Sequence, residues 1–154
     1  MELQTMKTLG EMGATAALGI SAVGSAIGIG MAGSAAIGAW KKAYAQGKSA
    51  LFTLLVFVGA PMSQTIYGMI LLNFINDAVK ENPENWAAYL GAGIFGGMGM
   101  AVSAWFQGKA GAAAADALNE TGKGFANYLM VLGVVETIAL FVLVFSGNAF
   151  VSVK

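Results

Sequence analysis

A single carboxylate, Glu136, stands alone in an apolar segment that is long enough to cross a membrane. The segment runs over 125–150, and Glu136 is the only charged residue between Lys123 and Lys154. An ionised carboxylate near the middle of a bilayer costs roughly 3 kcal/mol or more, so it needs a proton, a counter-charge or a bound cation. The position of Glu136 therefore predicts a functional site inside the membrane.

Three polar side chains gather on one face of the apolar stretch over 51–75. At about 100° per residue, Ser63, Gln64 and Tyr67 fall on the same side of a helix and face one neighbour together. Pro61 lies beside them, and because proline has no N–H, we expect a kink that frees a backbone carbonyl oxygen nearby. A hydroxyl, an amide, a phenol and a carbonyl are therefore expected close to one another.

A second amide, Gln107, is expected at the same depth as Gln64 and Glu136. Together these groups form a set of oxygen ligands, which hard cations prefer, whereas a proton needs only the carboxylate. The alternative is that Ser63, Gln64 and Gln107 only join helices through hydrogen bonds, each worth about 0.6–2 kcal/mol. Their convergence on one intramembrane carboxylate favours an ion site.

The composition is that of a membrane protein. The 154 residues are 57% hydrophobic and 10% charged, whereas a typical soluble domain has about 25% charged residues. The chain has no histidine and no cysteine, which excludes a zinc site, a disulfide framework and catalysis by either residue. The eight lysines balance eight acidic residues, which argues against nucleic acid as a partner.

Four apolar stretches each exceed the roughly 20 residues that a membrane helix needs. They run over 12–39, over 51–75, from 86 to 106 or beyond, and over 125–150. We predict an all-α membrane protein with four transmembrane helices in a single domain over 1–154. Two tandem hairpins, 12–76 and 86–150, make up that domain.

The loops differ in charge, which predicts the orientation. The loop over 40–50 contains three lysines and no acid, whereas 77–85 contains three acids and one lysine. Since lysine and arginine are enriched in cytoplasmic loops, we expect 40–50 and 116–124 to be cytoplasmic. Both termini and 77–85 are expected outside.

The two predicted hairpins resemble each other in sequence. The segment Gln64-Thr-Ile in the first matches Glu136-Thr-Ile in the second, and a weaker match sets Ser25 against Gln107. Each half crosses the membrane twice, so the halves are expected to be parallel. A duplicated hairpin has then kept its carboxylate in one half only.

The first and third apolar stretches are rich in glycine and alanine, and the other two are bulky. Gly24 and Gly28 form a GxxxG motif, which is typical of helices that pack backbone to backbone. This asymmetry favours a ring of copies with the first and third helices inside and the second and fourth outside. Ordinary packing in a monomeric bundle is the alternative.

These features together resemble the proteolipid of V-type and A/V-type ATPases, which forms the rotor ring and is often called their K or c component. Two segments carry most of the resemblance, Ala60-Pro-Met-Ser-Gln-Thr-Ile-Tyr-Gly68 and Val134-Val-Glu-Thr137. The likeness is nearest to bacterial sodium-translocating members and covers almost the whole chain. It implies a non-catalytic, ion-carrying subunit with no catalytic and no cofactor-binding residues, in a bacterial or archaeal plasma membrane.

The resemblance also implies roles for individual residues. The residues that match the family's Na⁺ ligands are Ala60 through its backbone carbonyl, Ser63, Gln64, Gln107 and Glu136. Tyr67 matches the phenol that hydrogen-bonds the carboxylate. The implied cargo is Na⁺, and no other cofactor is expected.

The implied mechanism is rotary. Identical copies form a ring in the lipid, and Glu136 holds its cation until it meets a stator membrane subunit. That subunit supplies an arginine, because this chain has none. A central stalk subunit docks on the cytoplasmic loops and couples rotation to ATP hydrolysis or synthesis.

Three other interpretations remain open. The nearest is the same rotor with H⁺ as the coupling ion. A small oligomeric secondary transporter for cations is less favoured, and so is a pore-forming proteolipid, which gives no reason for a buried carboxylate. Lys109 and Asp116 share a helix face, as a paired or snorkelling lysine would, but they have no assigned role.

Overall fold

The computed structural model describes residues 1–151, with side chains described through Asn148. The elements in chain order are α1 (Leu3–Ala45), α2 (Leu54–Gly59), the 3-10 turn η1 (Ala60–Met62), α3 (Ser63–Glu81), the 3-10 turn η2 (Pro83–Asn85), α4 (Trp86–Thr121) and α5 (Phe125–Val151). No strand occurs within residues 1–151. The all-α prediction is confirmed.

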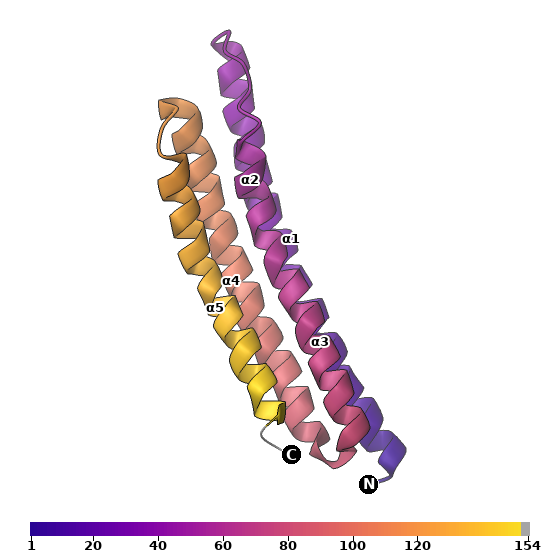
Figure 1. Ribbon diagram of the computed structural model, residues 1–154. Coiled ribbons are helices and arrows are strands. Elements are labelled where there is room, and N and C mark those ends of the chain that lie inside the picture. Colours follow the sequence, from indigo (N-terminus) through magenta and orange to yellow (C-terminus); the bar gives the residue numbers. More distant parts are fainter. Residues whose placement is uncertain (152–154) are drawn as a thin grey trace.

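Four helical spans are long and apolar enough to cross a membrane, as the sequence predicted. They are Leu3–Ala45, Leu54–Glu81, Pro83–Thr121 and Phe125–Asn148. The spans run side by side in an elongated bundle (Figure 1). The start of α1, the α3–α4 connection and the end of α5 lie at one end, and the other two connections lie at the opposite end. The C-terminal residues 152–154, which were predicted to lie outside the membrane, fall beyond the described residues.

The helices α1 and α3 extend beyond the apolar stretches that predicted them, whereas α4 and α5 agree with theirs. The first stretch was predicted over 12–39, but α1 has 43 residues. A helix of that length is about 65 Å long, whereas the hydrocarbon core of a bilayer is only about 30 Å thick. Hydropathy marks the part of a helix that is dehydrated, and good helix formers such as Lys41, Lys42 and Ala43 continue it into water.

The second span is interrupted at Pro61, where its missing N–H predicts a disturbance. The α-helix α2 ends at Gly59, continues as η1 and resumes as α3 at Ser63. Pro61 itself is buried. The chain keeps its overall direction through this turn, so the residues before and after it belong to one span.

The glycine-rich helices α1 and α4 form the most extensive contact in the bundle, as the sequence predicted. A Cβ added at Gly24 would overlap the backbone of Ala101, and one added at Gly108 would overlap the backbone of Gly28. Glycine is needed at these positions because the two backbones approach more closely than a side chain allows. The pairing of these two helices is confirmed, but a single chain does not test the predicted ring.

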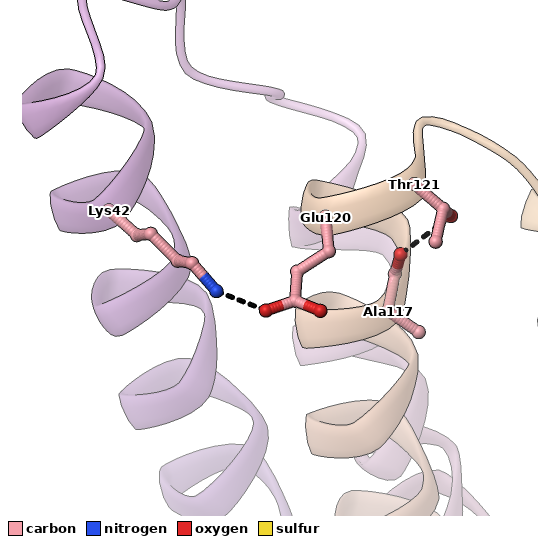
Figure 2. A network of polar contacts seen from close by, with 4 residues as sticks. All are labelled: Lys42, Ala117, Glu120 and Thr121. Carbon is pink, nitrogen blue, oxygen red and sulfur yellow. Dashed lines mark hydrogen bonds and ion pairs between the residues drawn. The ribbon is translucent and has the colours of Figure 1, made fainter.

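The register between α1 and α4 corrects one detail of the internal repeat. Lys42 of α1 forms an ion pair with Glu120 of α4, 78 residues further along the chain (Figure 2). Gly28 lies against the backbone between Ala104 and Gly108. Residues of α1 therefore lie level with residues of α4 that follow them by about 78 positions.

An offset of 78 residues between α1 and α4 also aligns the two repeats better than the match of Ser25 with Gln107. It places Ser25 level with Ser103, and Ile29 level with Gln107. It also pairs glycines, such as Gly30 with Gly108. The match of Ser25 with Gln107 was therefore wrong by one helical turn, since the repeated small residues allow more than one alignment.

Candidate ion-binding site

Glu136 lies on α5 and is held by hydrogen-bond donors from two other helices. The Tyr67 hydroxyl of α3 donates to Oε1 at 2.6 Å, and Gln107 Nε2 of α4 donates to Oε2 at 3.2 Å. Within residues 1–148, neither of the two ion pairs involves Glu136. The carboxylate is therefore oriented by neutral donors, and no cationic side chain among the described residues is paired with it.

Gln107 connects the carboxylate to the rest of the site. Its side chain is fully buried, and its Nε2 donates to the Leu132 carbonyl at 3.0 Å in addition to Glu136. Its Oε1 accepts a hydrogen bond from Gln64 Nε2 at 2.9 Å. One amide thus joins α3, α4 and α5 at the depth of Glu136.

Three oxygen atoms, from Ala60, Ser63 and Gln64, gather at the oxygen end of the Gln64 amide. The nitrogen end of that amide is the one that contacts Gln107. Ser63 Oγ lies 3.1 Å from the Ala60 carbonyl oxygen and 3.2 Å from Gln64 Oε1. A hydroxyl carries a single hydrogen, so it satisfies only one of these two acceptors at a time. The cluster therefore has more oxygen lone pairs than hydrogens, which is the arrangement that a hard cation requires.

The break in the second span explains why these oxygens are available. Ala60 lies in the 3-10 turn η1, and its carbonyl accepts the backbone N–H of Ser63, where α3 begins. The tight turn brings the Ser63 hydroxyl beside the same carbonyl oxygen. Pro61 has no N–H to donate to the carbonyl of Phe57, four residues earlier, and that carbonyl lies against Gly111 of α4. The structure thus places the Ala60 carbonyl, and not that of Phe57, beside the Ser63 hydroxyl.

Ser103 is a polar contact that sequence reasoning missed. Its hydroxyl donates to the Val135 carbonyl at 2.9 Å and accepts from Gln64 Nε2 at 3.4 Å. The available signal was its spacing, since Ser103 precedes Gln107 by one helical turn and so shares its face. Because α4 contains many small residues, a serine there is expected to serve packing, and its type alone did not indicate a contact within the site.

Lys109 and Asp116 take no part in the site. Both side chains are exposed, and no ion pair joins them in the described part of the chain. The Lys109 ammonium lies 5.4 Å from the ring centre of Phe106 and 6.0 Å from that of Trp105. The aliphatic stem and the charge of Lys109 are thus accommodated by aromatic neighbours on its own helix.

Comparison with known proteins agrees with the repeat and with the four spans. Residues 12–75 and 90–146 each match the family model that describes the C subunit of ATP synthase. A relative, the A-type ATP synthase subunit K of Methanocaldococcus jannaschii, is 32% identical over 153 residues. The alignment covers 92% of this chain but only 65% of the relative. The proteolipid resemblance inferred from the motifs is thereby confirmed, and the chain belongs to the family of ATP synthase C subunits.

Proposed function

We propose that this chain is the ion-carrying membrane rotor subunit of a rotary ATPase or ATP synthase, with Na⁺ bound beside Glu136. The observation that carries the proposal is the oxygen cluster of Ala60, Ser63 and Gln64, which is linked to the carboxylate through Gln107. The chain is non-catalytic, and the chemistry of ATP belongs to other subunits of the complex.

The charge of the site fits a monovalent cation. Glu136 is the one ionisable ligand, and the other proposed ligands are neutral oxygens. In the described residues, no group of three or more His, Cys, Asp or Glu side chains lies together, as a tight divalent site built from carboxylates would require. A single positive charge neutralises the carboxylate and allows it to remain in the apolar surroundings.

Neutral hydrogen-bond donors orient the Glu136 carboxylate. Gln107 Nε2 also bonds the Leu132 carbonyl, so the end of the amide that faces α5 can only donate. Tyr67 donates to the other carboxylate oxygen, so both oxygens accept hydrogen bonds. Carboxylate oxygens held in this way are ligands for a hard cation, which supports a cation as the bound ion.

Release of the ion requires a group from outside the chain. In the proposed cycle, a loaded subunit turns through the lipid until Glu136 meets a stator membrane subunit, where an arginine competes for the carboxylate. This chain contains no arginine, so that group belongs to the stator. Tyr67 and Gln107 hold the carboxylate in place while it is loaded, and their hydrogen bonds break and re-form as it turns outward.

The rotor is a ring of identical copies in this proposal. The glycine-rich helices α1 and α4 face the ring axis, where space is narrow, and α3 and α5 face the lipid. The connections at 40–50 and 116–124 are cytoplasmic and receive the central stalk, while both termini and 77–85 are external. The membrane is a bacterial or archaeal plasma membrane.

Two experiments test the two parts of this proposal separately. The size of the complex in mild detergent tests the rotor, since a large SDS-resistant ring supports it and a dimer contradicts it. Labelling of Glu136 by a carbodiimide, which attacks the protonated acid, tests the ion. Protection by millimolar Na⁺ but not by K⁺ supports the sodium site, whereas labelling that follows pH alone assigns H⁺ as the coupling ion.

A further inference from the structure

Ser103 is a buried hydroxyl that contacts two other helices within the site. It lies on α4, is 4% exposed, and donates its hydrogen to the Val135 carbonyl of α5 at 2.9 Å. It also accepts a hydrogen bond from Gln64 Nε2 of α3 at 3.4 Å. None of its hydrogen bonds involves the Glu136 carboxylate.

The direction of these bonds follows from counting hydrogens. A hydroxyl has one hydrogen, and a backbone carbonyl can only accept, so the hydrogen of Ser103 is committed to Val135. Only the lone pairs of Ser103 remain for Gln64, which must therefore present its N–H end. The oxygen end of the Gln64 amide is then turned away from Ser103 and towards Ser63.

Gln107 imposes the same choice from a second position. Its Nε2 is committed to the Leu132 carbonyl, so its Oε1 faces Gln64 and accepts a hydrogen bond from Nε2 at 2.9 Å. Both hydrogens of the Gln64 amide are then used, one on Gln107 and one on Ser103. A reversed Gln64 would bring oxygen against two acceptor oxygens and point N–H groups at the cation.

The first half of the chain contains a matched serine without this connection. Ser25 occupies the position of Ser103 in the repeat, and its side chain is 3% exposed. Among the described residues, its hydroxyl has no hydrogen-bond partner. A buried serine at this position of the repeat therefore does not need the contacts that Ser103 makes in order to pack.

We infer that Ser103 is a positioning residue that turns the oxygen of Gln64 towards the ion, an inference that rests on the sodium site proposed above. Loss of this hydroxyl leaves one N–H of Gln64 without a partner, so that Gln107 alone then holds the amide. Sodium binding weakens, because a ligand oxygen is held less firmly. Proton binding to Glu136 is unaffected, because Ser103 forms no hydrogen bond with the carboxylate.

The test compares Ser103→Ala with Ser25→Ala in assembled rings in membranes. Two quantities are measured for each, the Na⁺ concentration that halves carbodiimide labelling at fixed pH, and the pH of half-labelling without Na⁺. Ser103→Ala is expected to raise the half-protecting Na⁺ concentration about tenfold and to leave the pH of half-labelling unchanged. Ser25→Ala changes neither quantity, and Ser103→Thr, which keeps the hydroxyl, restores sodium protection.

The possible outcomes distinguish failure of this inference from failure of the proposed sodium site. A wild-type ring that Na⁺ does not protect overturns the sodium site and the inference together. A protected wild-type ring with an equally protected Ser103→Ala ring overturns the inference alone. So does a shift of the pH of half-labelling in parallel with the Na⁺ concentration, which would indicate general loosening of the bundle.

A third substitution covers failure of the alanine variant to assemble. Ser103→Cys keeps the volume of the side chain but hydrogen-bonds weakly. It is expected to raise the half-protecting Na⁺ concentration at an unchanged pH of half-labelling. Wild-type sodium protection in this variant would contradict a positioning role for the hydroxyl.

Discussion

The two halves of this chain share one architecture but differ at three equivalent positions. Glu136 of the second half corresponds to Gln64 of the first, Gln107 corresponds to Ile29, and the hydrogen-bonded Ser103 corresponds to the unpaired Ser25. The polar groups are therefore concentrated where α3 meets α4 and α5. The equivalent place in the first half contains Gln64 itself and the buried Ser25, but no carboxylate and no second amide.

The difference shows how a duplicated hairpin can make one site out of two. The first half supplies a neutral amide where the second supplies the charge, and that amide reaches across to Gln107 at 2.9 Å. One carboxylate in four helices limits the desolvation penalty to a single charge for each chain. We therefore expect one ion for each chain, with ligands from both halves.

Removal of the Glu136 charge should abolish the main difference between the two halves, and ion binding with it. Glu136→Gln makes the two halves alike at this position and leaves no carboxylate in the site. Carbodiimide labelling and Na⁺ binding should both be lost completely, while the ring still assembles because α1 and α4 are unchanged. A variant that retains Na⁺-dependent transport would contradict the assignment of Glu136.

The next largest effect is expected when Gln107 is replaced by its counterpart in the first half. Gln107→Ile removes the side-chain partner of the Leu132 carbonyl, of one Gln64 N–H and of one carboxylate oxygen. Each unsatisfied group costs about 1–3 kcal/mol, so the half-protecting Na⁺ concentration should rise about a hundredfold. Ile29→Leu is the matched control in the first half and should bind Na⁺ as the wild type does.

Removal of the Tyr67 hydroxyl, which orients the carboxylate, should have a smaller effect on Na⁺ binding. Tyr67→Phe removes the donor that lies 2.6 Å from Glu136 Oε1 but keeps the ring. A hydrogen bond to a charged group contributes about 1.5–3 kcal/mol, and we expect Na⁺ to be needed at about tenfold higher concentration. Carbodiimide labelling of Glu136 at fixed pH, with increasing Na⁺, measures this change. An unchanged labelling profile would show that the contact is not maintained in the ring.

The close approach of the halves can be tested apart from the ion site. Gly24→Ala places a Cβ against the backbone of Ala101, whereas an added Cβ at Gly38 meets nothing within 4 Å. Overpacking of this kind costs about 1–3 kcal/mol, so Gly24→Ala should lower the melting temperature of the ring. Gly38→Ala should match or exceed the wild type, since alanine favours the helix. Equal melting temperatures for the two variants would argue against the packing described here.

Much of the fold followed from the sequence because a bilayer imposes simple requirements. Four apolar stretches of sufficient length predicted four spans, and Glu136 was conspicuous because it lies in the most apolar of them. The lengths of the first two spans were underestimated, since helix-forming residues, several of them polar, follow each of these two apolar stretches. The repeat was aligned one turn out, because glycine and alanine recur too often along α1 and α4 to fix the register.

The large polar side chains of the site were named from the sequence, but of the hydrogen bonds between them only that from Tyr67 to Glu136 was expected. Gln64, Gln107 and Tyr67 are large polar residues in apolar helices, so their positions alone drew attention. Ser103 and the carbonyls of Leu132 and Val135 were missed. A backbone carbonyl has no sequence signal, and a serine in a small-residue helix is indistinguishable from one that only packs.

The central claim is that each chain binds one Na⁺ through Glu136 and ligands from both halves. Equilibrium binding of radioactive Na⁺ to purified rings, with the bound ion counted for each chain, tests it most directly. The account predicts saturation at one Na⁺ for each wild-type chain, no binding to Glu136→Gln rings, and no displacement by equimolar K⁺. Rings that bind no Na⁺ at neutral pH, or that bind it equally well without the carboxylate, would contradict the account.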